Sequence, residues 1–144
     1  MIMAITREER LALLAAASEE ELIDAADACL AAASSFAVVT PPAVGCVPAQ
    51  VREPILRERF ILGDVLACTA EVEFDGVRGW AMRLGQDRAA VLAMAVLDAA
   101  AACSPDLAGE IDALCERAAE RARQADAAEW AELAPTIVQF EELS

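Results

Sequence analysis

The sequence predicts an α+β fold: a mainly antiparallel sheet with a central β-hairpin, an N-terminal helical hairpin and two longer C-terminal helices. Three observations support this class. Two capping-box patterns lie near the N-terminus, an Asp-Gly pair joins two strand-like runs, and alanine-rich apolar segments fill the second half of the chain. Because 144 residues fit one ordinary domain, we treat residues 1–144 as a single domain.

The N-terminal helices are predicted from their first residues. Thr6 and Ser18 each stand three residues before a glutamate, which is the pattern of a capping box. We therefore expect helices over about residues 7–17 and 19–33. The acidic residues 19–21 lie where the helix dipole favours negative charge, so a helix-stabilising role explains them better than a catalytic one.

Two strands are expected next. Residues 36–40 have strand composition and end at Pro41-Pro42. Residues 45–52 can form a second strand, which Pro48 would restrict to an edge or irregular position.

A polar link then carries the only local cluster of positive charge, formed by Arg52, Arg57 and Arg59. A solvated or interface loop is the simpler interpretation. A loop that contacts phosphate or another anion is the alternative.

The clearest local pattern is the hairpin around Asp75-Gly76, a pair typical of a type I′ turn. This turn would pair Phe74 with Val77 and continue to a pair between residues 71 and 80. Both faces of the hairpin are largely apolar, so the helices of the chain should cover one face, and further helices or a partner protein the other. Gly79 inside a strand suggests a close backbone approach.

Two long helices should follow. Asp87 is the expected N-cap of a helix that runs to about residue 103 and is apolar nearly all round, as buried helices are. Asp98 is its exception, and we expect it to pair with an arginine or a backbone donor, with a functional carboxylate as the alternative. Ser104-Pro105 opens a helix to about residue 132, and residues 136–140 resume a strand-like pattern that either returns to the sheet edge or reaches another subunit.

Composition excludes several classes of function. The chain has no His and no Lys, so Ser-His and Cys-His pairs, imidazole metal ligands and a P-loop lysine are all absent. A net charge of −14 argues against nucleic acid as a partner. The five cysteines show no C-x-x-C spacing, which favours buried free thiols. The longest apolar run is too short to cross a membrane and no signal peptide is evident, so a cytoplasmic location is expected.

Several segments of the chain recur in a known family: in order, PPAVGCVPAQVRE, RFILGD, GVRGWAMRLGQD, AVLDAA and the tail TIVQFEEL. Together they resemble the PhnG family, the G subunit of the bacterial carbon-phosphorus lyase complex, and the similarity runs from about residue 7 to the end. The sequence departs from the family at Ala43-Val44, where members often have an acidic residue and Thr, and at Ile61, where they often have Asn. Any polar role of these positions in the family does not carry over.

The resemblance implies a role in organophosphonate catabolism as a non-catalytic structural subunit. Its partners would be PhnI, PhnH and PhnJ-like subunits and possibly PhnL, with two copies of this chain in a two-fold complex. That complex would form ribose 1-phosphonate 5′-triphosphate from ATP and an alkylphosphonate, with S-adenosylmethionine and an iron-sulfur cluster in another subunit. No catalytic, cofactor or metal residue is implied for this chain.

The predicted partner-binding surface surrounds the hairpin, which we expect to present a flat apolar face to the I or J subunit. The candidate interface residues are Gly63, Asp64, Gly79, Trp80, Gly85 and Asp87. Two alternatives stay open. One is a free-standing small acidic enzyme that uses Asp64, Asp87 or Asp98, with arginines binding an anionic substrate. The other is a self-associating helical adaptor unrelated to phosphonates.

Overall fold

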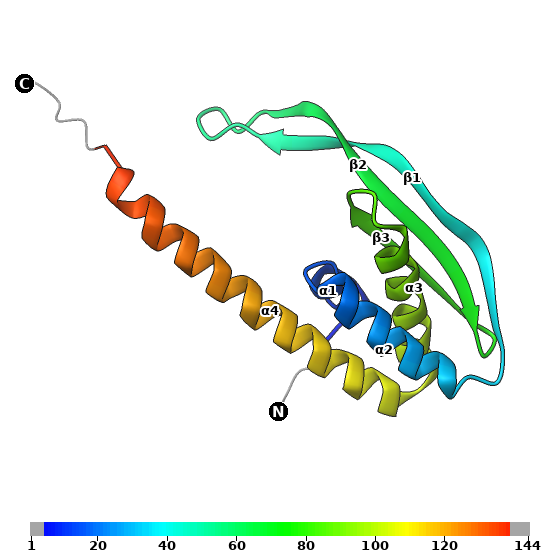
Figure 1. Cartoon of the computed structure of the whole chain (residues 1–144). Helices are drawn as coiled ribbons and strands as arrows, with labels where there is room; N and C mark the ends of the chain where they lie inside the picture. The colour runs from blue at the N-terminus through cyan, green and yellow to red at the C-terminus, as the bar shows by residue number, and fades with distance from the viewer. Residues whose placement is uncertain (1–4, 139–144) are drawn as a thin grey trace, which may run out of the picture.

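The computed structural model describes residues 5–138, in which four α-helices lie on one side of a three-stranded antiparallel sheet (Figure 1). This arrangement confirms the predicted α+β class. In chain order the elements are α1 (Arg7–Leu14), α2 (Glu19–Ala31), β1 (Phe36–Arg52), β2 (Arg59–Phe74), β3 (Val77–Leu84), α3 (Arg88–Cys103), α4 (Pro105–Leu133) and the 3-10 helix η1 (Ala134–Thr136). The strand order is β1-β2-β3.

Both predicted capping boxes are present and start α1 and α2. The backbone N–H of Thr6 donates to the Glu9 carboxylate over 2.8 Å, and the Thr6 hydroxyl accepts from the Glu9 N–H. The first helix ends at Leu14 rather than near residue 17, because the N–H groups of Ala16 and Ala17 bond to carbonyls three residues back and tighten the chain into a turn. The second ends at residue 31 rather than near 33.

The structure corrects the prediction of two strands between residues 36 and 52. They form one continuous strand, β1, which pairs with β2 along its length. The proline pair at 41 and 42 is accommodated because the register shifts between Thr40 and Ala43, and because β1 is an edge strand whose outer side needs no ladder donors. The predicted polar link is the turn of this long hairpin.

The β2–β3 hairpin has the predicted register, from Phe74 opposite Val77 to Glu71 opposite Trp80. Asp75 and Gly76 both have positive φ, 46° and 80°, as a type I′ turn requires. The Asp75 carboxylate also accepts from the N–H groups of Ser34 and Ser35 at 2.8 and 2.7 Å. This contact, which the sequence did not indicate, fixes the turn to the start of β1.

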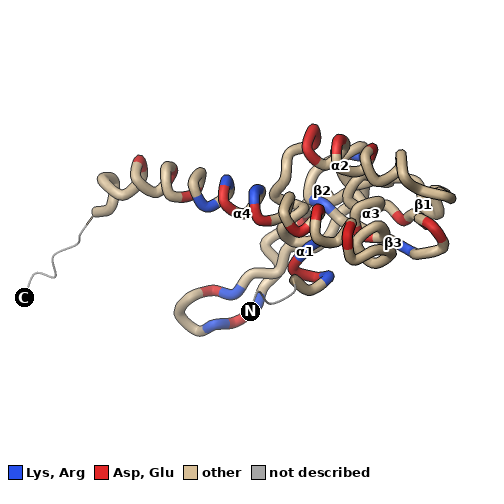
Figure 2. Tube along the Cα trace, turned by 90° about the horizontal axis from the view of Figure 1, so that it is seen from below, with Lys and Arg blue, Asp and Glu red and all other residues tan. Residues whose placement is uncertain are grey.

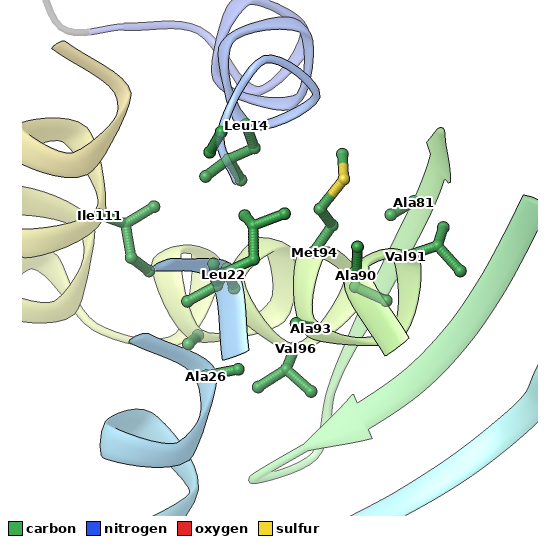
Figure 3. Packing of buried hydrophobic residues seen from close by; sticks show 14 of the residues in the cluster. Leu14, Leu22, Ala26, Ala81, Ala90, Val91, Ala93, Met94, Val96 and Ile111 are labelled. Atoms are coloured by element: carbon green, nitrogen blue, oxygen red, sulfur yellow. The ribbon is translucent and has the colours of Figure 1, made fainter. Parts of the chain in front are cut away.

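The core lies between α3 and the sheet, with α1, α2 and α4 packed around α3. Figure 3 shows Leu14 of α1, Leu22 of α2 and Ile111 of α4 converging on Met94 and its neighbours in α3. Helix α3 is buried through most of its length, as its apolar sequence predicted. One sheet face is therefore covered by the helices of the chain.

The opposite sheet face is open in the part of the chain that the structure describes. Trp80, Met82 and Leu84 of β3 point to this side and are 43%, 40% and 66% exposed. The prediction that both hairpin faces are covered thus holds for one face within this chain.

Two segments project from the core. Strand β3 pairs with β2 only as far as Ala67, so the paired residues 46–52 and 59–66, with their turn, extend alone; we call residues 46–66 the hairpin arm. The last buried residue of helix α4 is Ala118, and the last ion pair between α4 and the rest of the fold joins Arg121 to Glu21. We call the residues that follow, 122–138, the helical arm. Both arms point to the same side of the molecule (Figures 1 and 2).

The strand-like pattern expected at residues 136–140 is not seen as far as the description extends. Thr136 belongs to η1, and Ile137 and Val138 are outside any helix or strand. Residues 139 and 140 lie outside the described range. None of the described helices is both long enough and apolar enough to span a membrane.

Candidate functional site

The hairpin arm is the most apolar exposed part of the described chain. Phe60, Ile61 and Leu62 are three successive exposed apolar residues of β2, and Ile55 and Leu56 in the turn are 86% and 74% exposed. In a strand with one face in water, apolar and polar residues alternate, and an isolated two-stranded ribbon is only marginally stable. Apolar groups on both faces of such a ribbon are suited to contact with other protein surfaces.

This surface differs from the sequence prediction, in which residues 52–59 form a polar link. A signal was present in Ile55-Leu56, since two adjacent large apolar residues are unusual in a solvated turn. Their exposure follows from tertiary structure alone: no helix of the described chain extends over the arm (Figure 1).

The tip of the hairpin arm brings the three predicted arginines together. Arg52 and Arg59 are cross-strand partners, and Arg57 lies in the turn with a φ of 58°. Among residues 5–138 none of them forms a salt bridge. Glu53 and Glu58 lie between them in the sequence, so the tip carries three positive and two negative charges.

One of the tip carboxylates serves the turn itself. The Glu53 side chain accepts from the N–H of Ile55 at 2.9 Å and from the N–H of Leu56. These hydrogen bonds, the one from Ile55 above all, hold the pKa of Glu53 below its usual range. The carboxylate thus stays ionised while it organises the turn that presents Arg57.

The other candidate interface residues do not form one patch. Gly63 and Asp64 are exposed on the hairpin arm, whereas Trp80 lies on the open face of the sheet. Gly85 and Asp87 lie in the connection from β3 to α3, where the Asp87 carboxylate accepts from the N–H of Ala90 at 2.9 Å. The N-cap role predicted for Asp87 is confirmed, and a partner contact at these five positions stays a prediction.

The expectation for Gly79 is corrected. Gly79 is buried, and a Cβ atom built on it would lie 2.2 Å from the carbonyl oxygen of Ala95 and 2.7 Å from the Cβ of Ala99. The close approach predicted from the glycine is therefore made by α3 of the same chain. Gly79 presents no surface to another protein because the helix already occupies that space.

The buried carboxylate of Asp98 holds three elements together. Its Oδ1 accepts from Arg7 Nε at 2.9 Å, and its Oδ2 accepts from Arg7 Nη2 at 2.6 Å and from the backbone N–H of Trp80 at 2.9 Å. The predicted pairing is confirmed with both kinds of donor. The hydrogen bond and charge of Asp98 raise the pKa of Arg7 above its ordinary value. Both oxygens are occupied by structural contacts, which leaves no open acid-base position on this side chain.

The cysteines are free thiols in different surroundings. Cys29, Cys68 and Cys115 are buried, as expected, and burial raises the pKa of Cys115 to about 11. Cys46 is exposed on the hairpin arm and Cys103 is half-buried, so the expectation of burial is wrong for these two. Across residues 5–138, no group of three or more Cys, Asp or Glu side chains is placed to hold a metal ion.

The helical arm carries a second exposed apolar surface. Trp130 and Leu133 of α4, and Ile137 just after η1, are 61%, 49% and 58% exposed. The prediction of a helix to about residue 132 assigned no surface to these side chains, although a tryptophan among alanine and acidic residues was a signal.

A smaller apolar groove lies between α2 and α3. Its volume is about 230 Å³, and Ile23, Leu30, Phe36 and Leu92 are among the residues that line it. Asp27 is its only charged lining residue, so it lacks the converging polar groups of a typical ligand site.

The comparison with known proteins agrees with the resemblance seen in the sequence. No curated protein matches the chain. A protein-family model described as phosphonate metabolism protein PhnG matches residues 5–144, which is nearly the whole chain. The chain therefore belongs to the PhnG family and takes part in phosphonate metabolism.

Proposed function

We propose that this chain is a non-catalytic structural subunit of a carbon-phosphorus lyase complex. In this role it supports formation of ribose 1-phosphonate 5′-triphosphate from ATP and an alkylphosphonate. Its family membership suggests that it belongs to a phosphonate-metabolism complex. PhnI, PhnH and PhnJ-like subunits, and possibly PhnL, are the partners we propose.

The observation that carries the proposal is the hairpin arm. Its exposed apolar residues lie on a ribbon that leaves the core and is covered by no helix of the described chain. Burial of a large apolar side chain contributes about 1.5–3 kcal/mol, so a partner that encloses the arm gains much of its binding free energy there. A catalytic subunit would instead be expected to bring polar side chains together in a cleft.

The cofactors of the reaction belong to other subunits in this proposal. ATP would be bound by the complex, and S-adenosylmethionine and the iron-sulfur cluster by another chain. The contribution of this chain is to position its partners. Its glutamates at the start of α1 and α2 complete capping boxes, through Glu9 and Glu21. Hydrogen bonds from the Thr6 backbone and hydroxyl lower the pKa of Glu9.

The free-standing enzyme gains no support from the geometry. Asp98 is engaged by Arg7 and Trp80, and Asp87 caps α3. The anion-contacting role of Arg52, Arg57 and Arg59 stays a second possibility, favoured by their clustering at the tip.

Co-expression tests the proposal. The chain is produced with PhnI, PhnH and PhnJ homologues of its own organism, purified through a tag on PhnI, and analysed by size-exclusion chromatography with light scattering. We expect all four chains to elute together in equimolar amounts. If this chain eluted separately from all three homologues, the proposal would be overturned.

A matched pair of variants tests the hairpin arm as the contact. Leu62→Asp places a charge on an arm residue that is 69% exposed, and Ala16→Asp places one on an exposed residue of the α1–α2 turn. Both variants should fold, as judged by circular dichroism, because neither residue is buried. Only Leu62→Asp should leave the complex. If both variants stayed in the complex equally well, the hairpin arm would not be part of the interface.

A further inference from the structure

A further strand could be added to this sheet at three places, and two of them are closed. Strand β1 carries Pro41, Pro42 and Pro48, which have no N–H group to offer a new neighbour. On the other side, the N–H of Trp80 in β3 donates to the carboxylate of Asp98 at 2.9 Å, so α3 closes that edge at its middle. Prolines and covering helices are common means by which a sheet avoids pairing with other chains.

The third place is the edge of the hairpin arm beyond the end of β3. Strand β3 ends at Leu84, and Gly85, with a φ of 99°, turns the chain away into α3. Strand β2 passes this position with residues 59–65, which include no proline. Within residues 5–138, β1 is the only segment whose backbone pairs with them. The other edge of β2 is therefore open along the arm.

One hydrogen bond shows which backbone groups face the open edge near β3. The N–H of Gly85 donates to the carbonyl of Leu66 at 2.8 Å, so Leu66 faces the β3 side of β2. Alternate residues of a strand present their backbone groups to the same side, so Asp64 faces the open edge. Its cross-strand partner Pro48 faces the outer edge of β1, where a missing N–H breaks no bond of the ribbon.

A second hydrogen bond assigns the residues near the tip. The N–H of Glu53 donates to the carbonyl of Glu58 at 3.0 Å, so Glu58 faces β1. Arg59 and Ile61 therefore face the open edge. A register shift against β1 separates this stretch from Asp64. The N–H and C=O groups of these three residues are the hydrogen-bonding groups of the edge.

The side chains around the edge favour an apolar neighbour. Phe60, Ile61 and Leu62 are exposed one after another. Residues 46–66 carry three arginines and three carboxylates, so net charge selects no partner. At about 3.3 Å per residue, residues 59–65 extend about 23 Å, which is the length of an ordinary strand.

We propose that an extended segment of a partner protein adds to β2 along residues 59–65 as a fourth strand, in line with β3. Backbone hydrogen bonds with Arg59, Ile61 and Asp64 hold the segment, and its apolar side chains contact Phe60 and Leu62. Strand addition is a general mode of peptide recognition. The inference rests on the proposed role in a complex and states how the hairpin arm is bound there.

A second copy of this chain fits the edge less well. In an antiparallel pair of two β2 edges centred on residue 62, the register shift of one copy lies against the register shift of the other. Two irregularities at the same level break the ladder of hydrogen bonds at its centre. A different chain can supply a segment whose backbone matches the shift.

Two proline variants test the added strand. Ile61→Pro removes an N–H from the open edge, and Gln50→Pro removes one from the outer edge of β1 directly across the ribbon. Neither change breaks a hydrogen bond between β1 and β2, and Pro48 shows that the ribbon accepts a proline at an outward position. The two variants should fold alike, as judged by circular dichroism, and differ in the edge that they block.

Each variant is co-expressed with the wild-type chain and the PhnI, PhnH and PhnJ homologues, and the complex is purified through the tag on PhnI. Intact-mass spectrometry gives the ratio of variant to wild type in the complex, divided by their ratio in the cells. Ile61→Pro should be depleted about 10-fold or more, because a carbonyl of the added strand loses its donor. Gln50→Pro should enter the complex as well as the wild type.

Equal ratios for the two proline variants would overturn strand addition. If both entered the complex while Leu62→Asp stayed out, the arm would be bound through its side chains alone, and the proposed function would stand. If the wild-type chain eluted apart from all three homologues, the proposed function and this inference would both fail. A dimer of the isolated chain that Ile61→Pro abolishes and Gln50→Pro preserves would show that a second copy fills the edge, contrary to the proposal.

Discussion

Gly79 and Gly63 are glycines of the same sheet, but they differ in the space available for a side chain. Gly79 lies under α3, where a Cβ would meet the Ala95 carbonyl oxygen at 2.2 Å. Gly63 lies on the hairpin arm, where a Cβ would meet nothing within 4 Å. The first glycine is required by packing and the second is not. Spacing in the sequence does not distinguish them, because both interrupt strand-like runs.

We therefore predict that Gly79→Val destabilises the isolated chain by about 3 kcal/mol, since the helix backbone cannot move away without loss of core packing. Gly63→Val is the matched control and should change the free energy of unfolding by less than about 0.5 kcal/mol. Urea denaturation followed by circular dichroism measures both. Similar values for the two variants would contradict the packing of α3 on Gly79.

Strand β2 is two structural units joined end to end. Residues 67–74 have β1 and β3 on either side and α3 above, whereas residues 59–66 have only β1. Local opening free energy follows the number of packed neighbours, so the two halves should differ in dynamics although they form one strand.

Hydrogen-deuterium exchange measures this difference in a dilute isolated chain. We predict that amides of residues 59–66 exchange on the order of 100-fold faster than those of residues 67–74, because the ribbon opens locally and the core half opens with the whole fold. Each half is the internal control for the other. The arm should become protected on assembly with its partners. Uniform protection along β2 in the isolated monomer would contradict an unsupported arm.

The ion pair of Arg7 and Asp98 joins parts of the molecule that are 91 residues apart in sequence. It fixes the start of α1 to the middle of α3, and the same carboxylate binds the N–H of Trp80 in β3. The two partners differ in exposure: the Arg7 side chain is 58% exposed and that of Asp98 only 1%. Loss of either partner therefore has a different consequence for the one left behind.

Arg7→Met should destabilise the chain by about 3 kcal/mol, because it leaves a buried carboxylate with only one backbone donor. Asp98→Asn should cost about 1 kcal/mol, because the remaining guanidinium is already hydrated and the amide oxygen can still accept from Trp80. Arg78→Met, which breaks the exposed pair with Glu71, is the control and should cost less than about 1 kcal/mol. Chemical denaturation measures all three, and equal losses for Arg7→Met and Arg78→Met would show that Asp98 is not dependent on Arg7.

Much of the fold follows from local patterns in the chain. The capping boxes at Thr6 and Ser18, the turn at Asp75-Gly76 and the cap at Asp87 each depend on residues within a few positions of one another. Hydrogen bonds and backbone preferences of this range are set by the local sequence. The burial of α3 was equally visible, since its apolar residues surround the whole helix.

Which residues form the interaction surface depends on packing between segments that are far apart in the sequence. Whether Ile61 or Trp130 is core or surface depends on which elements lie above them, and those elements come from distant parts of the chain. Gly79 faces α3, while the hairpin arm extends past the end of β3 and α4 extends past its last contact with the body. Local preference sets where each helix and strand begins, but exposure depends on packing between them, so only the tertiary structure could separate the apolar residues that form the core from those left for partners.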